Sequence, residues 1–117
     1  MTNLNEKSTH VDVNHIPVFS ELKERLQKHR IKLTQTMETN YGLLDHLYSL
    51  GVLSHEEFAD INSVRYKHSV TQTICALLNV LQSKPDDVDM VEPFFKALKQ
   101  TEQLHVVHFL KTDGGKS

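Results

Sequence analysis

The sequence predicts an all-α domain of six short helices within residues 17–111. Apolar residues recur there at the spacing of one helix face, and no segment gives a convincing strand pattern. The chain has only 4 glycines and 3 prolines, too few for the many tight turns of an all-β domain. Its 117 residues suit one domain with one core. The polar segments 1–16 and 112–117 lack this periodicity, and we expect them to be flexible tails.

The first helix is expected to begin near Pro17. Its apolar stripe has gaps of three, four, seven and four residues, and Ile31 lies off the stripe. The stripe comprises Phe19, Leu22, Leu26, Leu33 and Met37.

A second helix is predicted between Asn40 and Gly51. Asn40 is the expected N-cap, and Gly51 occupies the C′ position that favours glycine. Its apolar stripe consists of Leu43, Leu44, Leu47 and Leu50.

The third helix opens with a capping box. The Ser54 hydroxyl is expected to accept from the Glu57 amide while the Glu57 carboxylate accepts from the Ser54 amide. We expect Phe58, Ile61 and Val64 to point inward from this short helix.

The fourth helix is predicted to stop before Lys84-Pro85, because the residue that precedes proline disfavours the α region. Residues 86–92 are read as a loop or a single turn, and the fifth helix as starting near Pro93. Thr101 or Glu102 marks a break before the last helix. The inward residues expected of these three helices are Val70, Ile74, Leu77, Leu78 and Leu81, then Phe94, Phe95 and Leu98, then Leu104, Val107 and Leu110 with Val106 and Phe109 flanking.

Charge is segregated along the chain. Residues 17–39 hold five basic and three acidic side chains, whereas residues 40–62 hold four acidic ones and no lysine or arginine. Residues 63–84 are basic and residues 85–92 acidic. A domain of net charge −2 with two oppositely charged faces can dock head to tail on copies of itself or on relatives. The alternative is that these charges only solvate the helix faces.

Several function classes are disfavoured. No apolar run approaches the ~18 residues of a membrane span, and the first residues contain no secretory leader. The single cysteine makes no intramolecular disulfide, so we expect a cytoplasmic protein. The small net charge gives no general attraction to nucleic acid or to anionic membrane.

No local cluster predicts a metal site, a cofactor or an enzyme. His105 and His108 lie three apart, but zinc needs further ligands at matching spacing. Cys75 is expected to be a small buried residue, and Ser54 a cap rather than a nucleophile. Tyr41, Tyr48 and Tyr66 are candidate surface anchors for a partner.

Four segments in order carry a family resemblance: LQKHR at 26–30, LLDHLYSLGVLSHEEF at 43–58, LLNVLQSKP at 77–85 and FFKALKQTEQLH at 94–105. The second matches a leucine-rich helix followed by a G-[IV]-L-[TS]-x-E-E turn, and the fourth matches F-x-x-A-L-x-x-T-x-Q-x-H. The chain therefore resembles caspase recruitment domains (CARDs), most closely the apoptosome-type, initiator-caspase and adaptor CARDs.

The resemblance implies the death fold, a six-helix antiparallel Greek-key bundle with a bent first helix, over residues 17–111. It also implies homotypic CARD–CARD assembly in apoptotic or innate immune signalling. The implied partners are other CARD proteins (an initiator caspase, an adaptor or a receptor) and further copies of the chain, with no nucleic acid and no membrane.

Two family contact positions are matched, a basic one by Arg30 on the first helix and an acidic one by Asp45 on the second. The fourth helix departs from the family, because Thr71 and Cys75 occupy positions that are often basic. We expect the first and fourth helices to contact the second and third helices of a partner. The predicted basic face is Arg25, Lys28, Arg30, Arg65 and Lys67, and the predicted acidic face is Asp45, Glu56, Glu57 and Asp60.

Two rival functions come from other classes. A small helical DNA-binding protein is the alternative, because the turn between the second and third helices could imitate a helix-turn-helix. The acid-only stretch 40–62 speaks against it, since phosphate would be repelled there. A small enzyme is the weaker rival, because adjacent Glu56 and Glu57 point apart on a helix and no convergent polar set is present.

Overall fold

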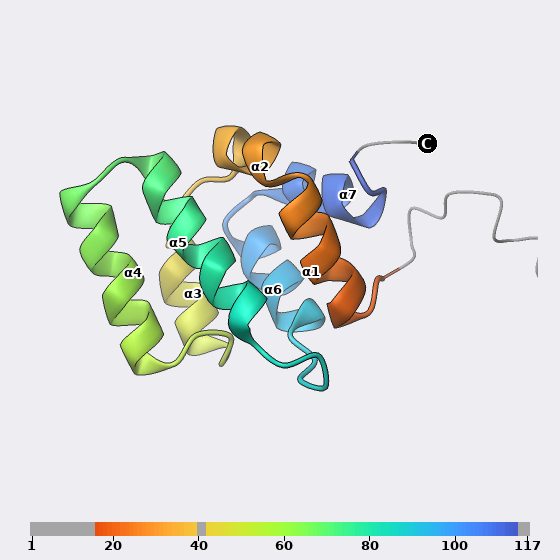
Figure 1. Cartoon of the computed structure of the whole chain (residues 1–117), viewed down its shortest axis with the longest axis horizontal. Coiled ribbons are helices and arrows are strands. Elements are labelled where there is room, and N and C mark those ends of the chain that lie inside the picture. The colour runs from red at the N-terminus through yellow and green to blue at the C-terminus, as the bar shows by residue number, and fades with distance from the viewer. Residues whose placement is uncertain (1–15, 40–41, 115–117) are drawn as a thin grey trace, which may run out of the picture.

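The computed structural model describes residues 16–39 and 42–114, and this part of the chain holds seven α-helices and no strand (Figure 1). The all-α prediction is confirmed, but the predicted count of six helices is one too low. The helices are α1 (Phe19–Lys28), α2 (Arg30–Thr36), α3 (Leu43–Ser49), α4 (His55–Lys67), α5 (Val70–Ser83), α6 (Val91–Gln100) and α7 (Leu104–Lys111). The predicted N-terminal tail, except Ile16, lies outside the described residues.

The additional helix comes from a bend in the predicted first helix. His29 separates α1 from α2 and has φ −106° and ψ 26°. Backbone hydrogen bonds continue across the bend, since the His29 amide donates to Arg25 and the Leu33 amide donates to His29, each at 2.9 Å. The seven-residue gap between Leu26 and Leu33 contains no core residue, and the bend lets both leucines be buried.

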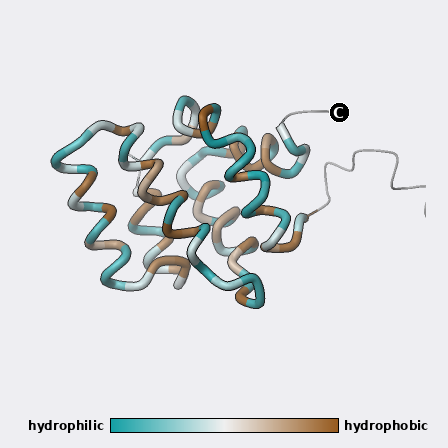
Figure 2. The backbone as a smooth tube through the Cα atoms, in the orientation of Figure 1, coloured by the Kyte–Doolittle hydropathy of each residue, from teal (hydrophilic) through white to brown (hydrophobic). Residues whose placement is uncertain are grey.

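Helix α5 lies between α4 on one side and α1 and α2 on the other (Figure 1). Helix α3 packs against α4 and α6, and α6 packs against α7. Hydrophobic and hydrophilic residues alternate along the helices (Figure 2). The core joins the leucines of α3 to Leu77 and Leu78 of α5 and to Phe94 of α6, and this packing fixes the direction in which the outer helix faces point.

The ends of α3 and the start of α4 are set by local signals. Gly42, at φ 86°, is the N-cap of α3, whereas Asn40 lies outside the described residues. Gly51, at φ 84°, follows the C-cap as predicted, and the Val52 amide donates to the Leu47 carbonyl at 2.9 Å. The predicted capping box is confirmed: the Glu57 amide donates to Ser54 Oγ at 3.1 Å, and the Ser54 amide donates to Glu57 Oε1 at 2.9 Å.

Some details of the helix predictions were wrong. Helix α6 begins at Val91, so Pro93 is its third residue rather than its first. The amides of the first helical turn have no acceptor within the helix, so the missing N–H of Pro93 costs no hydrogen bond there. Val70 and Leu104 are 44% and 61% exposed, because each is the first residue of its helix and lies outside the packed turns. The third predicted helix, α4, is 13 residues long rather than short, and only Ile61 on it is buried.

The helical unit extends past residue 111. Thr112, the first residue of the predicted C-terminal tail, is 3% exposed. Asp113 accepts from Lys28 Nζ at 3.2 Å, and its other carboxylate oxygen lies 3.0 Å from His29 Nε2. The chain therefore stays attached to the bend between α1 and α2 as far as Asp113.

Candidate interaction surface

The predicted acidic residues lie on two neighbouring helices, Asp45 on α3 and the other three on α4. Gly51 reverses the chain after α3, and the Ser54 capping box starts α4, so the two helices share a short connection. Asp45, Glu56 and Asp60 are exposed. Within the described part of the chain none of these three carboxylates takes part in an ion pair or a side-chain hydrogen bond. We call Asp45, Glu56 and Asp60 the acidic surface.

Glu57 differs from its neighbours, because the fold itself uses its carboxylate. Glu57 Oε1 accepts from the Ser54 amide and, at 2.8 Å, from Lys84 Nζ at the end of α5. Partial burial would raise the pKa of Glu57, but the hydrogen bonds from Lys84 and Ser54 and the charge of Lys84 hold that pKa below its usual value. Glu57 is therefore a structural residue that closes α4 against α5.

The three predicted basic residues of α1 and α2 are engaged within the chain. Arg25 Nη1 donates to the carbonyls of Leu110 and Lys111 at 2.8 and 3.2 Å, which satisfies the C-terminal end of α7. Lys28 pairs with Asp113. Arg30 Nη2 donates to Asn79 Oδ1 at 2.7 Å and to the Cys75 carbonyl at 3.2 Å, and thereby joins α2 to α5.

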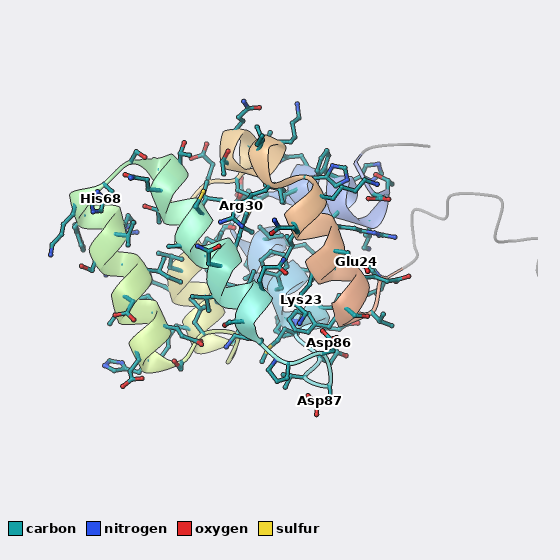
Figure 3. All side chains as sticks on the ribbon, viewed as in Figure 1. Lys23, Glu24, Arg30, His68, Asp86 and Asp87 are labelled. Atoms are coloured by element: carbon teal, nitrogen blue, oxygen red, sulfur yellow. The ribbon has the colours of Figure 1, made fainter. Side chains whose placement is uncertain are left out.

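Arg65 and Lys67 lie apart from the other predicted basic residues. Both are in the last turn of α4, next to His68, and α5 separates this end of α4 from α1 and α2 (Figure 3). The Arg65 guanidinium lies 5.3 Å from the centre of the Tyr66 ring. The structure thus places the predicted basic face as two groups on opposite sides of α5.

Two lysines that the sequence analysis did not propose as contacts join separate parts of the fold, the loop between α5 and α6 to α1 and the end of α5 to α4. Lys23 pairs with Asp86, and its ammonium also donates to the Lys84 carbonyl at 2.6 Å. Lys84 in turn pairs with Glu57. The residues of these contacts are 27 to 63 positions apart, so no local spacing could have indicated them.

Exposed tyrosines lie on the same two helices as the acidic surface. Tyr48, three residues after Asp45 on α3, is 42% exposed and stacks on Phe58 of α4 with ring centres 5.0 Å apart. Its hydroxyl lies 3.4 Å from His55 Nδ1. Tyr66 is 76% exposed, and Tyr41 lies outside the described residues. An exposed aromatic ring on the same helix as the free carboxylate of Asp45 suits a protein partner with basic side chains.

The remaining candidate sites of the sequence give no chemical centre. Among residues 16–39 and 42–114 no three His, Cys, Asp or Glu side chains gather as a metal site requires. Cys75 is half-buried rather than buried, because the core side of α5 passes through its neighbours Ile74 and Leu77. None of the described helices has the length and apolar character needed to cross a bilayer.

Comparison with known proteins gives one match. A family model described as caspase recruitment domain matches residues 23–113. No curated protein and no solved structure matches the chain.

Proposed function

Because the chain belongs to the caspase recruitment domain family, a family of homotypic protein-interaction modules, we propose that it assembles with other CARDs in apoptotic or innate immune signalling. The acidic surface on α3 and α4 meets arginines and lysines of the partner. The partner is an initiator caspase, an adaptor or a receptor that carries a CARD. The module has no enzymatic activity of its own and works in the cytoplasm. Its helices take the antiparallel Greek-key arrangement of the death fold, in which α1 and α2 together count as the bent first of six helices.

The observation that carries this proposal is the free state of the acidic surface. Asp45, Glu56 and Asp60 are exposed and unpaired within the described residues, and residues 40–62 contain no lysine or arginine to neutralise them. Complementary charge steers association and fixes the orientation of the partners. Such charge pairing is also screened by salt, so the interaction should weaken as ionic strength rises.

The basic side supports the proposal less strongly. Arg30 already donates to two groups of α5, and Arg25 to two carbonyls of α7. Reversing Arg30 would therefore disturb the packing of α2 on α5 as well as any contact with a partner. We propose that the acidic surface is the main contact, and that Arg65 and Lys67, which make no ion pair within the described residues, contribute to a second contact at other positions of an assembly.

The test is a pull-down of a panel of purified CARDs with the wild-type chain and with Asp45→Arg. We expect the wild type to retain at least one CARD. The affinity of Asp45→Arg for that CARD should be lower by about 30-fold or more, because a like charge then faces the partner's arginine. The free energy of unfolding of Asp45→Arg should lie within about 0.5 kcal/mol of the wild-type value, because the Asp45 side chain is exposed and unpaired in the described residues.

Glu24→Arg is the matched control. Glu24 is also an exposed acidic residue on a helix, but it lies on α1, on the other side of the molecule from α4 (Figure 3). It should bind as the wild type does. Equal binding by Asp45→Arg and the wild type, with the fold intact, would show that the acidic surface is not the contact.

A further inference from the structure

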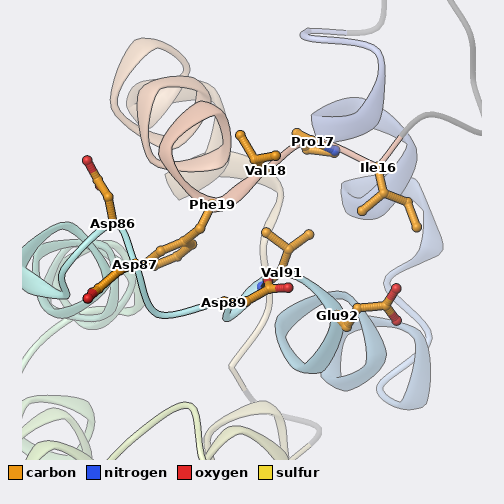
Figure 4. Close-up of a pocket in the computed structure, with 9 residues that line it drawn as sticks. All are labelled: Ile16, Pro17, Val18, Phe19, Asp86, Asp87, Asp89, Val91 and Glu92. Carbon is orange, nitrogen blue, oxygen red and sulfur yellow. Dashed lines mark hydrogen bonds between the residues drawn. The ribbon is translucent and has the colours of Figure 1, made fainter.

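A pocket with an apolar floor and an acidic rim lies where the start of α1 meets the loop between α5 and α6 (Figure 4). Its volume is about 360 Å³. Ile16 and Val18 line it and remain 44% and 61% exposed. Figure 4 shows Asp86 and Asp87 on one side of Val18 and Val91, and Glu92 on the other. The space exceeds the roughly 150 Å³ of a cavity that holds benzene, so it can accept one branched aliphatic side chain.

The carboxylates of the rim differ in their engagement. Asp86 pairs with Lys23, and Asp89 Oδ1 accepts from the Val91 amide at 3.1 Å. Asp87 and Glu92 are exposed and make no ion pair or side-chain hydrogen bond within the described residues. The pocket therefore offers an apolar floor with unneutralised negative charge beside it, which suits an aliphatic side chain carried on a basic surface.

Helix α2 presents such a side chain on the same molecule. Ile31 is 76% exposed, the same exposed fraction as Tyr66 and higher than that of any other exposed large apolar side chain in the described chain. Lys28 stands one turn before it, and the exposed Lys32 directly after it. Lys32 makes no ion pair within the described residues. Single exposed apolar residues are common, but this one lies on a basic helix and has the size that the acidic pocket accepts.

Ile31 cannot enter the pocket of its own chain. The pocket lies at the N-terminal end of α1, and α2 follows the C-terminal end of that helix. Ten helical residues separate the two ends by about 15 Å. Any contact between them must join two molecules, and it leaves a free pocket on one molecule and a free Ile31 on the other.

We propose that Ile31 of one copy inserts into the pocket at Ile16 and Val18 of a second copy, with Lys32 near the free carboxylates of the rim. The contact is heterologous, so it can continue from copy to copy into an open chain of subunits. It uses neither α3 nor α4, so it goes beyond the proposed recognition of partner CARDs and leaves the acidic surface accessible. Each subunit of the assembly would then display one acidic surface.

Sedimentation velocity of the full chain at increasing concentration and low salt tests this contact. We expect the wild type to associate, and Ile31→Asp and Val18→Asp each to weaken association by at least about tenfold, because each places a carboxylate in the apolar part of the contact. Val18 is the N-cap of α1, a position where Asp is favoured, so this variant should fold. Leu104→Asp is the matched control, since Leu104 is 61% exposed like Val18 but lies on α7. It should associate as the wild type does.

A mixture of the two defective variants gives the most specific result. The Ile31→Asp chain keeps its pocket and the Val18→Asp chain keeps its Ile31, so the mixture should form dimers and nothing larger. A wild type that stays monomeric at every concentration, a mixture without dimers, or a Leu104→Asp chain as defective as Ile31→Asp would overturn the proposal. Asp45→Arg should leave this association unchanged, so failure here is separable from failure of the acidic surface.

Discussion

The acidic surface on α3 and α4 and the predicted basic residues of α1 and α2 use their charge differently. Asp45, Glu56 and Asp60 have no partner within the described chain, whereas Arg25, Lys28 and Arg30 each bind another element of the fold. Charge that is engaged inside the molecule stabilises the bundle, and charge that is free remains available to a second molecule. A charge pattern along a sequence therefore indicates an interface only after the internal contacts are known.

The largest expected effect on stability comes from the engaged side. Arg25→Ala removes two charged hydrogen bonds at the end of α7, where the Leu110 carbonyl keeps only the bond from the Asp113 amide at 3.3 Å. We expect the free energy of unfolding to fall by about 2 kcal/mol. Urea denaturation measures it, with Lys32→Ala as the control because Lys32 is exposed and unpaired in the described chain. If the two variants had the same free energy of unfolding, engaged and free charges would not differ in their contribution to stability.

A smaller effect is expected at the start of α4, on which the acidic surface is built. Ser54→Ala removes the side-chain half of the capping box, while the Glu57 carboxylate keeps its bond to the Ser54 amide. The free energy of unfolding should fall by about 1 kcal/mol. Ser63→Ala, an exposed change inside the same helix, should change stability little. If Ser63→Ala proved as costly as Ser54→Ala, the loss would not come from the cap.

The smallest expected effect is a loss of stability as the pH falls. In the folded chain the hydrogen bond with His29 lowers the pKa of Asp113 from its ordinary value of 3.8 against the opposing effect of burial, and Lys28 lowers it further. A carboxyl with a lowered folded pKa stabilises the fold above its unfolded pKa and loses this contribution as pH falls through the folded pKa. Glu57 behaves in the same way from its ordinary value of 4.5. Stability should therefore decrease as pH falls below about 4.5.

Asp113→Asn separates this effect from general acid sensitivity. Denaturation at about pH 6 and about pH 3 should show a smaller loss of stability for Asp113→Asn than for the wild type. Asp60→Asn is the control, since Asp60 has no partner in the described residues and its replacement should leave the loss unchanged. An identical loss in the wild type and Asp113→Asn would show that the bond between Asp113 and His29 contributes nothing.

Local signals explain what the sequence predicted correctly. Ser54, Gly51 and the Lys84-Pro85 pair each act within a few residues, and the helix ends at these positions agree with the structure. The family resemblance implied a bent first helix, but no proline or glycine marks the position of the bend at His29. The absence of a core residue between Leu26 and Leu33 is a signal in retrospect.

Long-range contacts explain what the sequence could not provide. Arg25 binds residues 85 and 86 positions away, and Lys84 binds Glu57 across α4 and α5. The S-x-x-E spacing marks Glu57 as a capping residue and so separates it from Glu56, but no spacing indicates that Glu57 pairs with Lys84. The sign of each predicted face could be derived from the sequence, but the division into free and engaged charge depends on the packing of the helices.

The central claim is that Asp45 and its free neighbours meet basic side chains of a partner CARD. The most direct measurement is a charge swap. Each surface arginine of the CARD that the wild-type chain retains is changed to glutamate in turn, and the affinity of each changed partner for Asp45→Arg is measured. We predict that one reversed partner restores the affinity that Asp45→Arg loses, because opposite charges again face each other. If every reversed partner binds Asp45→Arg as weakly as the unmodified partner does, the account is contradicted.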